Sequence, residues 1–470
     1  MYDAVLINAP LSEDIMKAKY KALAPPLGLL SIAAVLLQNG INVEFIDGDK
    51  EDGIDSIMQK VKDCNPKYIG ISTTTMSFKN AVKLAEALKN THKDATVIMG
   101  GQHATYYAEK IMIKYVFIDA ICQGEGEYTF LELVQGKALS VIKGLVYREN
   151  GEIKFNEQRE MIEDLDQLPL PARQLADKYS YDIKFGFFDL RRHCYGRMFN
   201  YVSIITSRGC PGGCYFCSGT QYNGMRIRFR SAESVIRELD MLINKGCDTF
   251  FITDDNFTAS PARVKKICEY LKEQRKLKDI SWFCFGRVDT ASEELFKTMK
   301  EAGCYFILFG IEHISKEVRD YYHKNTTNEK IKNAIRIARK SGIGIYASVI
   351  VGAPVESLEE FDKCVKFFKK SRVDILEVHR LMIFPGSNLW RDMNEKFPQK
   401  ISALWEQPIS YTDIADSPTH EETCRRQKVL TRAFFVRFGF VFDIIVKIFS
   451  IKIENLLKRL KSESQGSANR

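Results

Sequence analysis

Short apolar runs alternate with longer mixed stretches over the N-terminal part of the chain. Tyr2 to Asn8 and Val43 to Asp47 have the length and apolar content of buried strands, and the stretches between such runs are predicted to be helical. Strands that alternate with helices imply an α/β domain with a Rossmann-like, doubly wound parallel sheet. Further strands are expected at residues 68–72 and 96–100, and the first helix is expected to end near Gln38.

The same alternation resumes from Tyr201 to about Trp390. Six apolar runs alternate with predicted helices there, which implies a partial (β/α)6, TIM-like barrel with its active site at the C-terminal ends of the strands. The predicted strands are Tyr201–Thr206, Thr249–Thr253, Ser281–Phe285, Tyr305–Gly310, Ile345–Val351 and Ile375–Met382. The predicted helices lie near residues 231–243, 261–275, 291–302, 328–340 and 357–370.

A connector joins these two halves. Asn150-Gly151 is a two-residue hairpin signal, and the prolines of Leu168 to Pro171 favour an extended linker. C-terminal to the barrel, the alternation gives way to a helical pattern, and we expect the tail from Ser462 to be disordered. The predicted domains are a Rossmann-like domain at 1–142, a connector at 143–199, a partial barrel at 200–392 and a C-terminal helical region at 393–470.

One C-terminal stretch, Ala433 to Ile451, is rich in Phe, Val and Ile but contains Arg437, Asp443 and Lys447. A spanning helix needs about 20 residues almost free of charge, so we predict no transmembrane segment. Packing of this apolar face against the barrel is the favoured interpretation. Peripheral contact with a membrane surface is the alternative, because basic residues follow the stretch.

Composition narrows the setting. The 470 residues suggest about three domains on the length prior, and the 12 cysteines are scattered through apolar segments with no secretory signal before them. We therefore expect a reducing, cytoplasmic compartment. The net charge of +8 is mild, and +6 of it falls in the last 50 residues, which hold 11 Lys and Arg against 5 Asp and Glu. The near-neutral remainder argues against nucleic acid as an obligatory partner.

The strongest chemical signal is a run of three cysteines, Cys210, Cys214 and Cys217, that follows the β-prone segment Tyr201–Thr206. The intervening glycines permit the positive φ that a tight thiolate loop needs. A structural zinc site needs a fourth protein ligand, whereas three thiolates on a 4Fe-4S cluster leave one iron open for a substrate. No second cysteine pair lies nearby, so the cluster is favoured over a zinc loop or three unrelated core cysteines.

This loop resembles the signature of the radical S-adenosylmethionine (SAM) enzymes, whose cysteines have the spacing of Cys210, Cys214 and Cys217; Phe216 before the last cysteine matches too. The resemblance implies that the amino and carboxylate groups of SAM chelate the open iron. One electron from the cluster then cleaves SAM to a 5′-deoxyadenosyl radical.

Polar residues after the predicted barrel strands are candidates for the SAM site. Glu312 matches the family's acidic residue that binds ribose hydroxyls, with a structural salt bridge as the alternative, and Arg287 could pair with the SAM carboxylate or lie at the surface. Ser348 to Glu356 resembles the family's Gly-x-Ile-x-Gly-x-x-Glu stretch, although Ser348 replaces its first Gly and Glu356 comes one residue late. Asp254 and Asp255 face the substrate or only cap the helix that follows. The predicted SAM-binding residues are Phe216, Gly219, Asp255, Arg287, Glu312, Ser348, Gly352 and Pro354.

Four polar loops follow the strands of the first sheet, where such sheets bind ligands. No Gly-x-Gly-x-x-Gly follows the first strand, which disfavours dinucleotides. The ordered loops resemble the cobalamin-binding domain in front of the radical core in the cobalamin-dependent (class B) subfamily; a flavodoxin-like domain with an empty crevice is the alternative. The residues that match are Pro26, Leu27, Gly28, Ser72, Thr73, Thr74, Gly100, Gly101, His103, Gly124, Glu125 and Glu127.

The chain lacks the Asp-x-His-x-x-Gly loop that supplies a histidine to cobalt in the methionine-synthase type of cobalamin domain. We therefore expect cobalamin without that ligand, and we interpret His103 as a hydrogen-bonded loop histidine. The resemblance implies methylation of an unactivated carbon or phosphorus of a small-molecule substrate, with an electron donor such as flavodoxin or ferredoxin. Alternatives are oxidative cyclisation, ring rearrangement, or a non-catalytic cobalamin or iron-sulfur binding module. No catalytic residue and no substrate can be assigned from the sequence.

Overall fold

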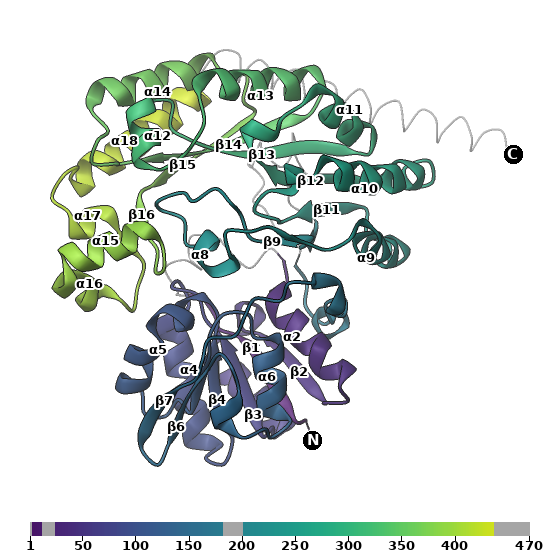
Figure 1. Cartoon of the computed structure of the whole chain (residues 1–470), viewed down its shortest axis with the longest axis vertical. Coiled ribbons are helices and arrows are strands. Elements are labelled where there is room, and N and C mark those ends of the chain that lie inside the picture. The colour runs from purple at the N-terminus through teal and green to yellow at the C-terminus, as the bar shows by residue number, and fades with distance from the viewer. Residues whose placement is uncertain (1, 12–23, 182–200, 437–470) are drawn as a thin grey trace, which may run out of the picture.

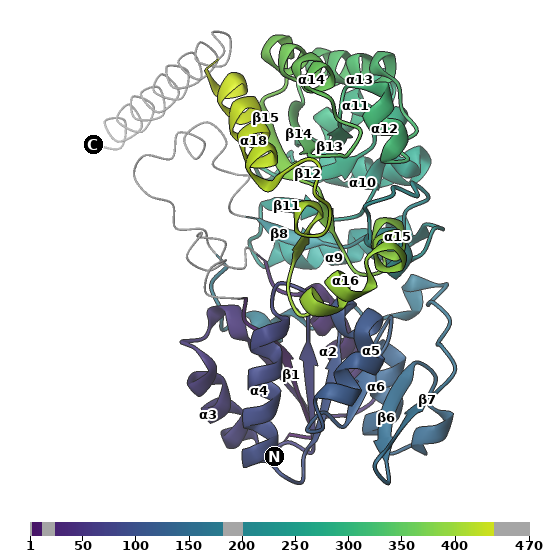
Figure 2. The same cartoon turned by 90° about the vertical axis from the view of Figure 1, so that its left-hand side faces the viewer.

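The computed structural model of the chain describes residues 2–11, 24–181 and 201–436, which form two lobes, each built on its own sheet (Figures 1 and 2). The first sheet has seven strands in the order β2-β1-β3-β4-β5-β6-β7. Its strands are β1 Ala4–Asn8, β2 Val43–Asp47, β3 Tyr68–Ser72, β4 Thr96–Gly100, β5 Ala120–Cys122, β6 Leu145–Glu149 and β7 Glu152–Phe155.

Strands β1 to β5 of this sheet are parallel, and both faces are covered by helices. Apolar side chains of α2 and α6 pack on one face and those of α3, α4 and α5 on the other. These helices span α2 Leu27–Gln38, α3 Ile54–Cys64, α4 Phe78–Thr91, α5 Gln102–Lys114 and α6 Glu127–Val134. The strand order reverses between β1 and β3, and at such a switch point the carboxyl ends of the strands leave a crevice.

The predicted hairpin at Asn150-Gly151 forms as β6 and β7, with both residues at positive φ. Strand β6 pairs antiparallel with β5. The hairpin that we placed in the connector therefore extends the first sheet, because the open edge of β5 offers it unpaired backbone groups.

The second sheet has six parallel strands in the order β15-β14-β13-β12-β11-β8, as a partial barrel requires. Its strands are β8 Val202–Ile204, β11 Thr249–Ile252, β12 Ser281–Gly286, β13 Cys304–Glu312, β14 Gly344–Val351 and β15 Ile375–Arg380. The helices of this lobe span α8 Gly219–Asn223, α9 Ala232–Asn244, α10 Pro261–Gln274, α11 Glu293–Glu301, α12 Lys316–Tyr321, α13 Asn328–Lys340 and α14 Leu358–Lys370. A small ladder, β9 Ser207–Arg208 with β10 Arg228–Phe229, flanks the cysteine loop.

The C-terminal helices bridge the two lobes, and Figure 2 shows α15 and α16 beside α5. The Trp390 indole donates to the Tyr107 hydroxyl at 2.9 Å, and Trp405 packs on aromatic side chains of the first lobe. The elements are α15 Asn388–Lys396, α16 Pro398–Leu404, α17 Tyr411–Ile414, α18 His420–Phe435, β16 Met382–Ile383 and β17 Ile409–Ser410. Short 3-10 turns lie at Gly48–Lys50, Leu139–Val141, Leu165–Gln167, Arg173–Ala176, Phe257–Ala259 and Val288–Thr290.

The predicted fold class is confirmed, since a doubly wound sheet, a six-stranded partial barrel and C-terminal helices are all present. Within the described ranges, no helix is long and apolar enough to cross a membrane. Most of the apolar stretch 433–451 and the tail from Ser462 lie outside the described residues.

Candidate functional site

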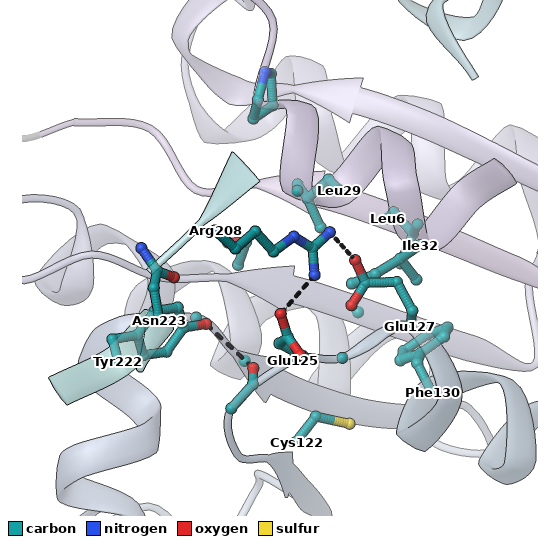
Figure 3. A pocket seen from close by; sticks show the side chains of 18 of the residues that line it. Leu6, Leu29, Ile32, Cys122, Glu125, Glu127, Phe130, Arg208, Tyr222 and Asn223 are labelled. Carbon is teal, nitrogen blue, oxygen red and sulfur yellow. Dashed lines mark hydrogen bonds and ion pairs between the residues drawn. The ribbon is translucent and has the colours of Figure 1, made fainter. Parts of the chain in front are cut away.

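A cavity lies between the lobes, at the carboxyl ends of the first sheet. Side chains of both lobes line it, as Figure 3 shows for part of its wall. From the first lobe come the loops after β3, β4 and β5 together with the start of α2. From the second lobe come Ile205, Ser207, Arg208, Tyr222, Asn223, Thr253 and Asp255, which surround the cysteine loop.

The inner wall of this cavity is apolar, with Leu6, Leu29 and Ile98 among its side chains. A Cβ at Gly28 would meet no atom within 4 Å, and neither would one at Gly124, so the backbone there is open. Ser72 supplies a hydroxyl at the rim. An apolar slot with open glycine backbone and a hydroxyl fits a large flat ligand such as cobalamin.

Most of the residues predicted to bind cobalamin line this cavity, namely Pro26, Gly28, Ser72, Gly100, Gly101, Gly124, Glu125 and Glu127. Leu27, Thr73 and Thr74 are not among its lining residues. Leu27 is buried in the core, the Thr73 hydroxyl donates to the Gly100 carbonyl at 3.0 Å, and Thr74 takes part in the turn before α4. We predicted these three residues to bind cobalamin because they are adjacent in sequence to residues that line the cavity.

His103 lies in the core beside the cavity. It is fully buried between Phe78, Tyr107 and Trp405, and its Nδ1 lies 3.2 Å from the Thr75 hydroxyl. Burial lowers the pKa of His103 to about 3, so the ring is neutral at pH 7. His103 is thus hydrogen-bonded, as we interpreted it, but it lies in the first turn of α5 rather than in a loop, and it is not among the described residues that line the cavity.

The carboxylates of Glu125 and Glu127 point to arginines of the second lobe. The Arg208 guanidinium donates to Glu125 at 2.7 Å and to Glu127 at 2.6 Å, bridging the two as Figure 3 shows. Glu125 also accepts from Arg228 at 2.8 Å and from the Ile162 amide at 2.7 Å. Burial opposes the charged forms, but the arginines lower the pKa of Glu125, and both carboxylates raise that of Arg208.

The cysteine loop forms a cradle for a cluster. A Cβ at Gly212 would stand 3.4 Å from the Cys210 sulfur, 3.7 Å from that of Cys214 and 2.8 Å from an Arg287 nitrogen, so glycine keeps this volume free. At Gly219 a Cβ would lie 3.6 Å from the Cys217 sulfur. In the described part of the chain, no three His, Cys, Asp or Glu side chains gather closely enough to hold a single metal ion. Three thiols on one loop, beside space that Gly212 and Gly219 keep free, fit a 4Fe-4S cluster with one open iron.

Residues at the ends of neighbouring helices and strands hold this loop in place. The Cys210 amide donates to the Gly224 carbonyl at 3.0 Å, and the Tyr215 amide donates to the Tyr322 carbonyl at 3.0 Å. The buried carboxylate of Asp254 accepts from the Thr206 amide and the Ser207 hydroxyl, both at 2.6 Å. Asp254 therefore steadies the segment that leads into the loop and does not cap the next helix.

Asp255 is an acidic residue of the second lobe that lines the cavity. Its carboxylate lies 3.9 Å from the point where a Cβ of Gly219 would stand, so it reaches the edge of the thiolate loop. Burial raises the pKa of Asp255, and a hydrogen bond with Asn223 partly offsets that rise. Asp255 thus links the cavity to the loop.

Arg287 also faces the thiolate loop. Asp289 holds it through two contacts, from Nε to Oδ1 at 3.0 Å and from Nη2 to Oδ2 at 2.9 Å, and the third nitrogen, Nη1, points to Gly212. The hydrogen bond to Asp289 raises the pKa of Arg287 despite burial. A guanidinium oriented in this way can offer its remaining edge to a carboxylate.

Glu312 ends β13 and forms an ion pair with Lys324 at 3.1 Å. Its φ of +63° is rare for a side chain of this kind, and the pairing of β13 with β14 slips between Gly310 and Glu312. The salt bridge that we weighed as the alternative is present. We did not single out Lys324 from the sequence. Its ammonium group lies near Cys214 of the cysteine loop. Against the effect of burial, the charges of Glu312 and Cys214 raise the pKa of Lys324.

The stretch from Ser348 to Glu356 divides. Ser348 lies in β14 opposite Gly310, Pro354 is exposed, and a Cβ at Gly352 would meet Thr423 of α18 at 2.6 Å. The buried carboxylate of Glu356 accepts from the Gly352 amide at 2.7 Å and from Arg426 at 2.8 Å. Helix α18 thus covers Gly352, which we predicted to bind SAM.

Two families match the chain: the radical SAM superfamily over residues 204–368 and the B12 binding domain over residues 13–134. An uncharacterized methyltransferase of Pyrococcus horikoshii is 35% identical over 395 residues, covering 82% of each chain. An anaerobic magnesium-protoporphyrin IX monomethyl ester cyclase of Rubrivivax gelatinosus is 26% identical over 79% of this chain and 67% of the relative. The radical SAM methyltransferase TsrM of Kitasatospora setae, solved with cobalamin and a [4Fe-4S] cluster, superposes with a TM-score of 0.65 at 20% identity, over 84% and 75% of the two chains.

Proposed function

The chain belongs to the cobalamin-dependent radical SAM methyltransferase family, and we propose that it methylates an unactivated carbon or phosphorus of a small molecule. One observation carries this proposal: the cavity of the first lobe is closed on its other side by residues next to the thiolate loop. Groups that must react with one substrate have to be held near contact distance. A cavity shared by both lobes provides such a place.

In this family the cluster supplies the electron that cleaves SAM, and cobalamin carries the methyl group. We assign Cys210, Cys214 and Cys217 to the cluster. The sulfurs of Cys210 and Cys214 face the volume that Gly212 leaves open, and that of Cys217 faces the volume that Gly219 leaves open. We assign the SAM carboxylate to the free edge of Arg287. We assign cobalamin to the apolar slot and open glycine backbone of the first lobe.

The side chains of the cavity exclude water and orient the substrate. Its apolar wall disfavours charged groups, whereas Asp255, Tyr222 and Asn223 offer polar contacts on the cluster side. We therefore propose that the substrate lies between the apolar wall and this polar edge.

Isotope labelling tests the reaction. SAM with a labelled methyl group should give labelled product, together with 5′-deoxyadenosine and S-adenosylhomocysteine in about equal amounts. If the substrate is converted and 5′-deoxyadenosine forms but S-adenosylhomocysteine does not, the reaction is a cyclisation or rearrangement and not a methylation. The sequence similarity to a cyclase is the observation that supports cyclisation as the second candidate function.

We add three further proposals. A flavodoxin or ferredoxin is the electron donor, and the location is cytoplasmic. Peripheral membrane contact through the stretch 433–451 is the alternative to packing of this stretch against the barrel. Reduction of the cluster by purified flavodoxin and flotation of the full chain with anionic vesicles test the donor and the membrane contact. For the division of the chain, we move the first boundary from 142 to a point after Phe155, because β6 and β7 belong to the first sheet, and we propose the other two at 199 and 392.

A further inference from the structure

The cysteine loop and the first lobe are connected by a buried group of four charges: Glu125, Glu127, Arg208 and Arg228. Their side chains are 8%, 4%, 19% and 3% exposed, respectively. Two carboxylates come from the first lobe and two guanidiniums from the second, so neither lobe can neutralise its own pair. Removing one partner of such a buried pair is strongly destabilising, because the remaining charge is left without a counterpart.

The carboxylate side of this group belongs to the cavity wall. Glu125 lies in the loop after β5 and Glu127 is the first residue of α6, both close to Gly124, whose open backbone faces the cavity. The Gly124 carbonyl accepts from the Tyr222 hydroxyl at 3.1 Å, and Glu127 also accepts from Ser31 of α2 at 3.0 Å. A ligand that fills the cavity therefore contacts the loop that carries both carboxylates.

The arginine side of the group leads to the thiolates. Arg208 and Arg228 stand opposite each other in the β9–β10 ladder, and only Gly209 separates Arg208 from Cys210. Gly209 has a φ of +96° and packs against the Arg226, Gly224 and Asn223 carbonyls, so this turn has little room to shift. A displacement of Arg208 is therefore transmitted to the position of Cys210.

We propose that Arg208 is a positioning residue that makes ligand binding in the cavity of the first lobe and assembly of the thiolate loop energetically dependent on each other. This inference rests on the proposed function only for the identity of the ligand as cobalamin. Coupling of this kind is reciprocal and typically amounts to about 5- to 150-fold in affinity.

Equilibrium dialysis of the full chain with hydroxocobalamin, with and without a reconstituted cluster, measures the coupling. We expect the native protein to bind at least about fivefold more tightly when the cluster is present. Arg208→Gln should bring the ratio of the two affinities close to one, and Arg208→Lys, which keeps the charge but not the fork, should give a value in between. Arg226→Gln is the matched control, because Arg226 lies in the same loop but pairs with Glu163 at the surface. An Arg208→Gln ratio equal to the native one would overturn the proposal.

A second variant covers the case in which Arg208→Gln holds no cluster. Glu127→Gln lies in the other lobe, and amide hydrogen exchange of the cofactor-free protein reports its effect at residues 209–217. We expect faster exchange there in Glu127→Gln and native exchange in Arg226→Gln; unchanged exchange in Glu127→Gln would overturn the coupling. If the native protein transfers methyl groups but shows an affinity ratio of one, only this inference fails. If exchange responds as expected but no methyl transfer occurs, only the proposed function fails.

Discussion

The thiolate loop and the cavity of the first lobe both lie at the carboxyl ends of parallel strands. The functional residues of the loop are close together in the sequence, whereas those of the cavity come from segments far apart in it. The three thiolates fall within eight residues, and the glycines that clear their volume lie among or directly beside them. The cavity combines four loops of one lobe with residues such as Tyr222 and Asp255 of the other. Strand-end position thus marks both sites, but only the first is encoded locally.

Acidic residues at the strand ends sharpen this comparison. In the first lobe, Glu125 and Glu127 bind arginines of the second lobe. In the second lobe, Asp254 and Glu312 bind partners within their own lobe. Asp255 instead lines the cavity, so four of these five carboxylates at strand ends are acceptors in ion pairs or hydrogen bonds within the protein.

The largest effect should come from the local site. Cys214→Ala removes one of three thiolates, so we expect loss of the iron and sulfide, about four of each per chain, and of all SAM cleavage. Metal analysis and a deoxyadenosine assay measure both. Cys247→Ala, at a thiol outside the loop, should change neither. Retention of the cluster in Cys214→Ala would contradict the assignment.

Filling the cavity should disable the other region alone. Gly28→Phe places a ring where a Cβ meets no atom within 4 Å, so it should occupy the ligand volume without straining the protein. We expect cobalamin affinity to fall about 100-fold, or about 2.7 kcal/mol. Gly28→Ala is the matched control and should bind nearly as the native protein does. Native affinity in Gly28→Phe would place the ligand elsewhere.

The stability of the protein should depend on pH through the buried network of His313, Glu356 and Arg426. His313 Nε2 lies 3.1 Å from the Glu356 carboxylate, which Arg426 also contacts. Burial alone would lower the pKa of His313, but Cys364 and Glu356 outweigh it and raise the value to about 9. Because the folded pKa exceeds the unfolded one, the stabilisation is complete below about pH 6.5 and is lost as the pH rises through 9.

We expect this group to contribute about 2 kcal/mol of stability at pH 7 that is gone by pH 10. Guanidinium unfolding of native protein and of His313→Gln at both pH values isolates the effect, since other groups titrate equally in both proteins. If the stability difference between the two proteins stays constant from pH 7 to pH 10, the ion pair does not form.

The smallest effect should come from a single contact between the regions. The Gln102 amide donates to the Ser218 hydroxyl at 2.6 Å, next to the last cysteine of the loop. Gln102→Ala should lower the free energy of unfolding by about 1 kcal/mol, the usual contribution of one such hydrogen bond. Gln59→Ala, at an exposed amide that bonds within one helix, should have a smaller effect in the same urea titration. Equal losses would show that the contact between the lobes adds nothing.

Local patterns were the predictable part of this molecule. The strands, the Asn150-Gly151 hairpin and the cysteine loop follow from neighbouring residues, and the structure contains all of them. The pairing of Arg208 with Glu125 joins residues 83 positions apart, and no sequence pattern in either segment predicts this partner. Lys324 was missed because a single lysine in a polar stretch carries no pattern.

The same reasoning explains where the predicted site residues divide. Gly28 and Gly124 were found because backbone that approaches a ligand calls for glycine, a property of the position itself. Thr423 of α18 lies over Gly352, a contact that depends on packing across the lobe. His103 became part of an aromatic core only when Trp405, some 300 residues later, packed beside it.

Electron paramagnetic resonance tests the shared cavity most directly, because it needs no substrate. The full chain is loaded with the cobalt(II) form of cobalamin and with a reduced cluster, and its spectrum is compared with those of the singly loaded proteins. We predict a magnetic interaction that broadens both signals, because we assign both cofactors to the one cavity that the two lobes share. We also predict a cobalt signal without nitrogen splitting, since no histidine is among the described residues that line the cavity. A spectrum equal to the sum of two undisturbed signals would contradict the account.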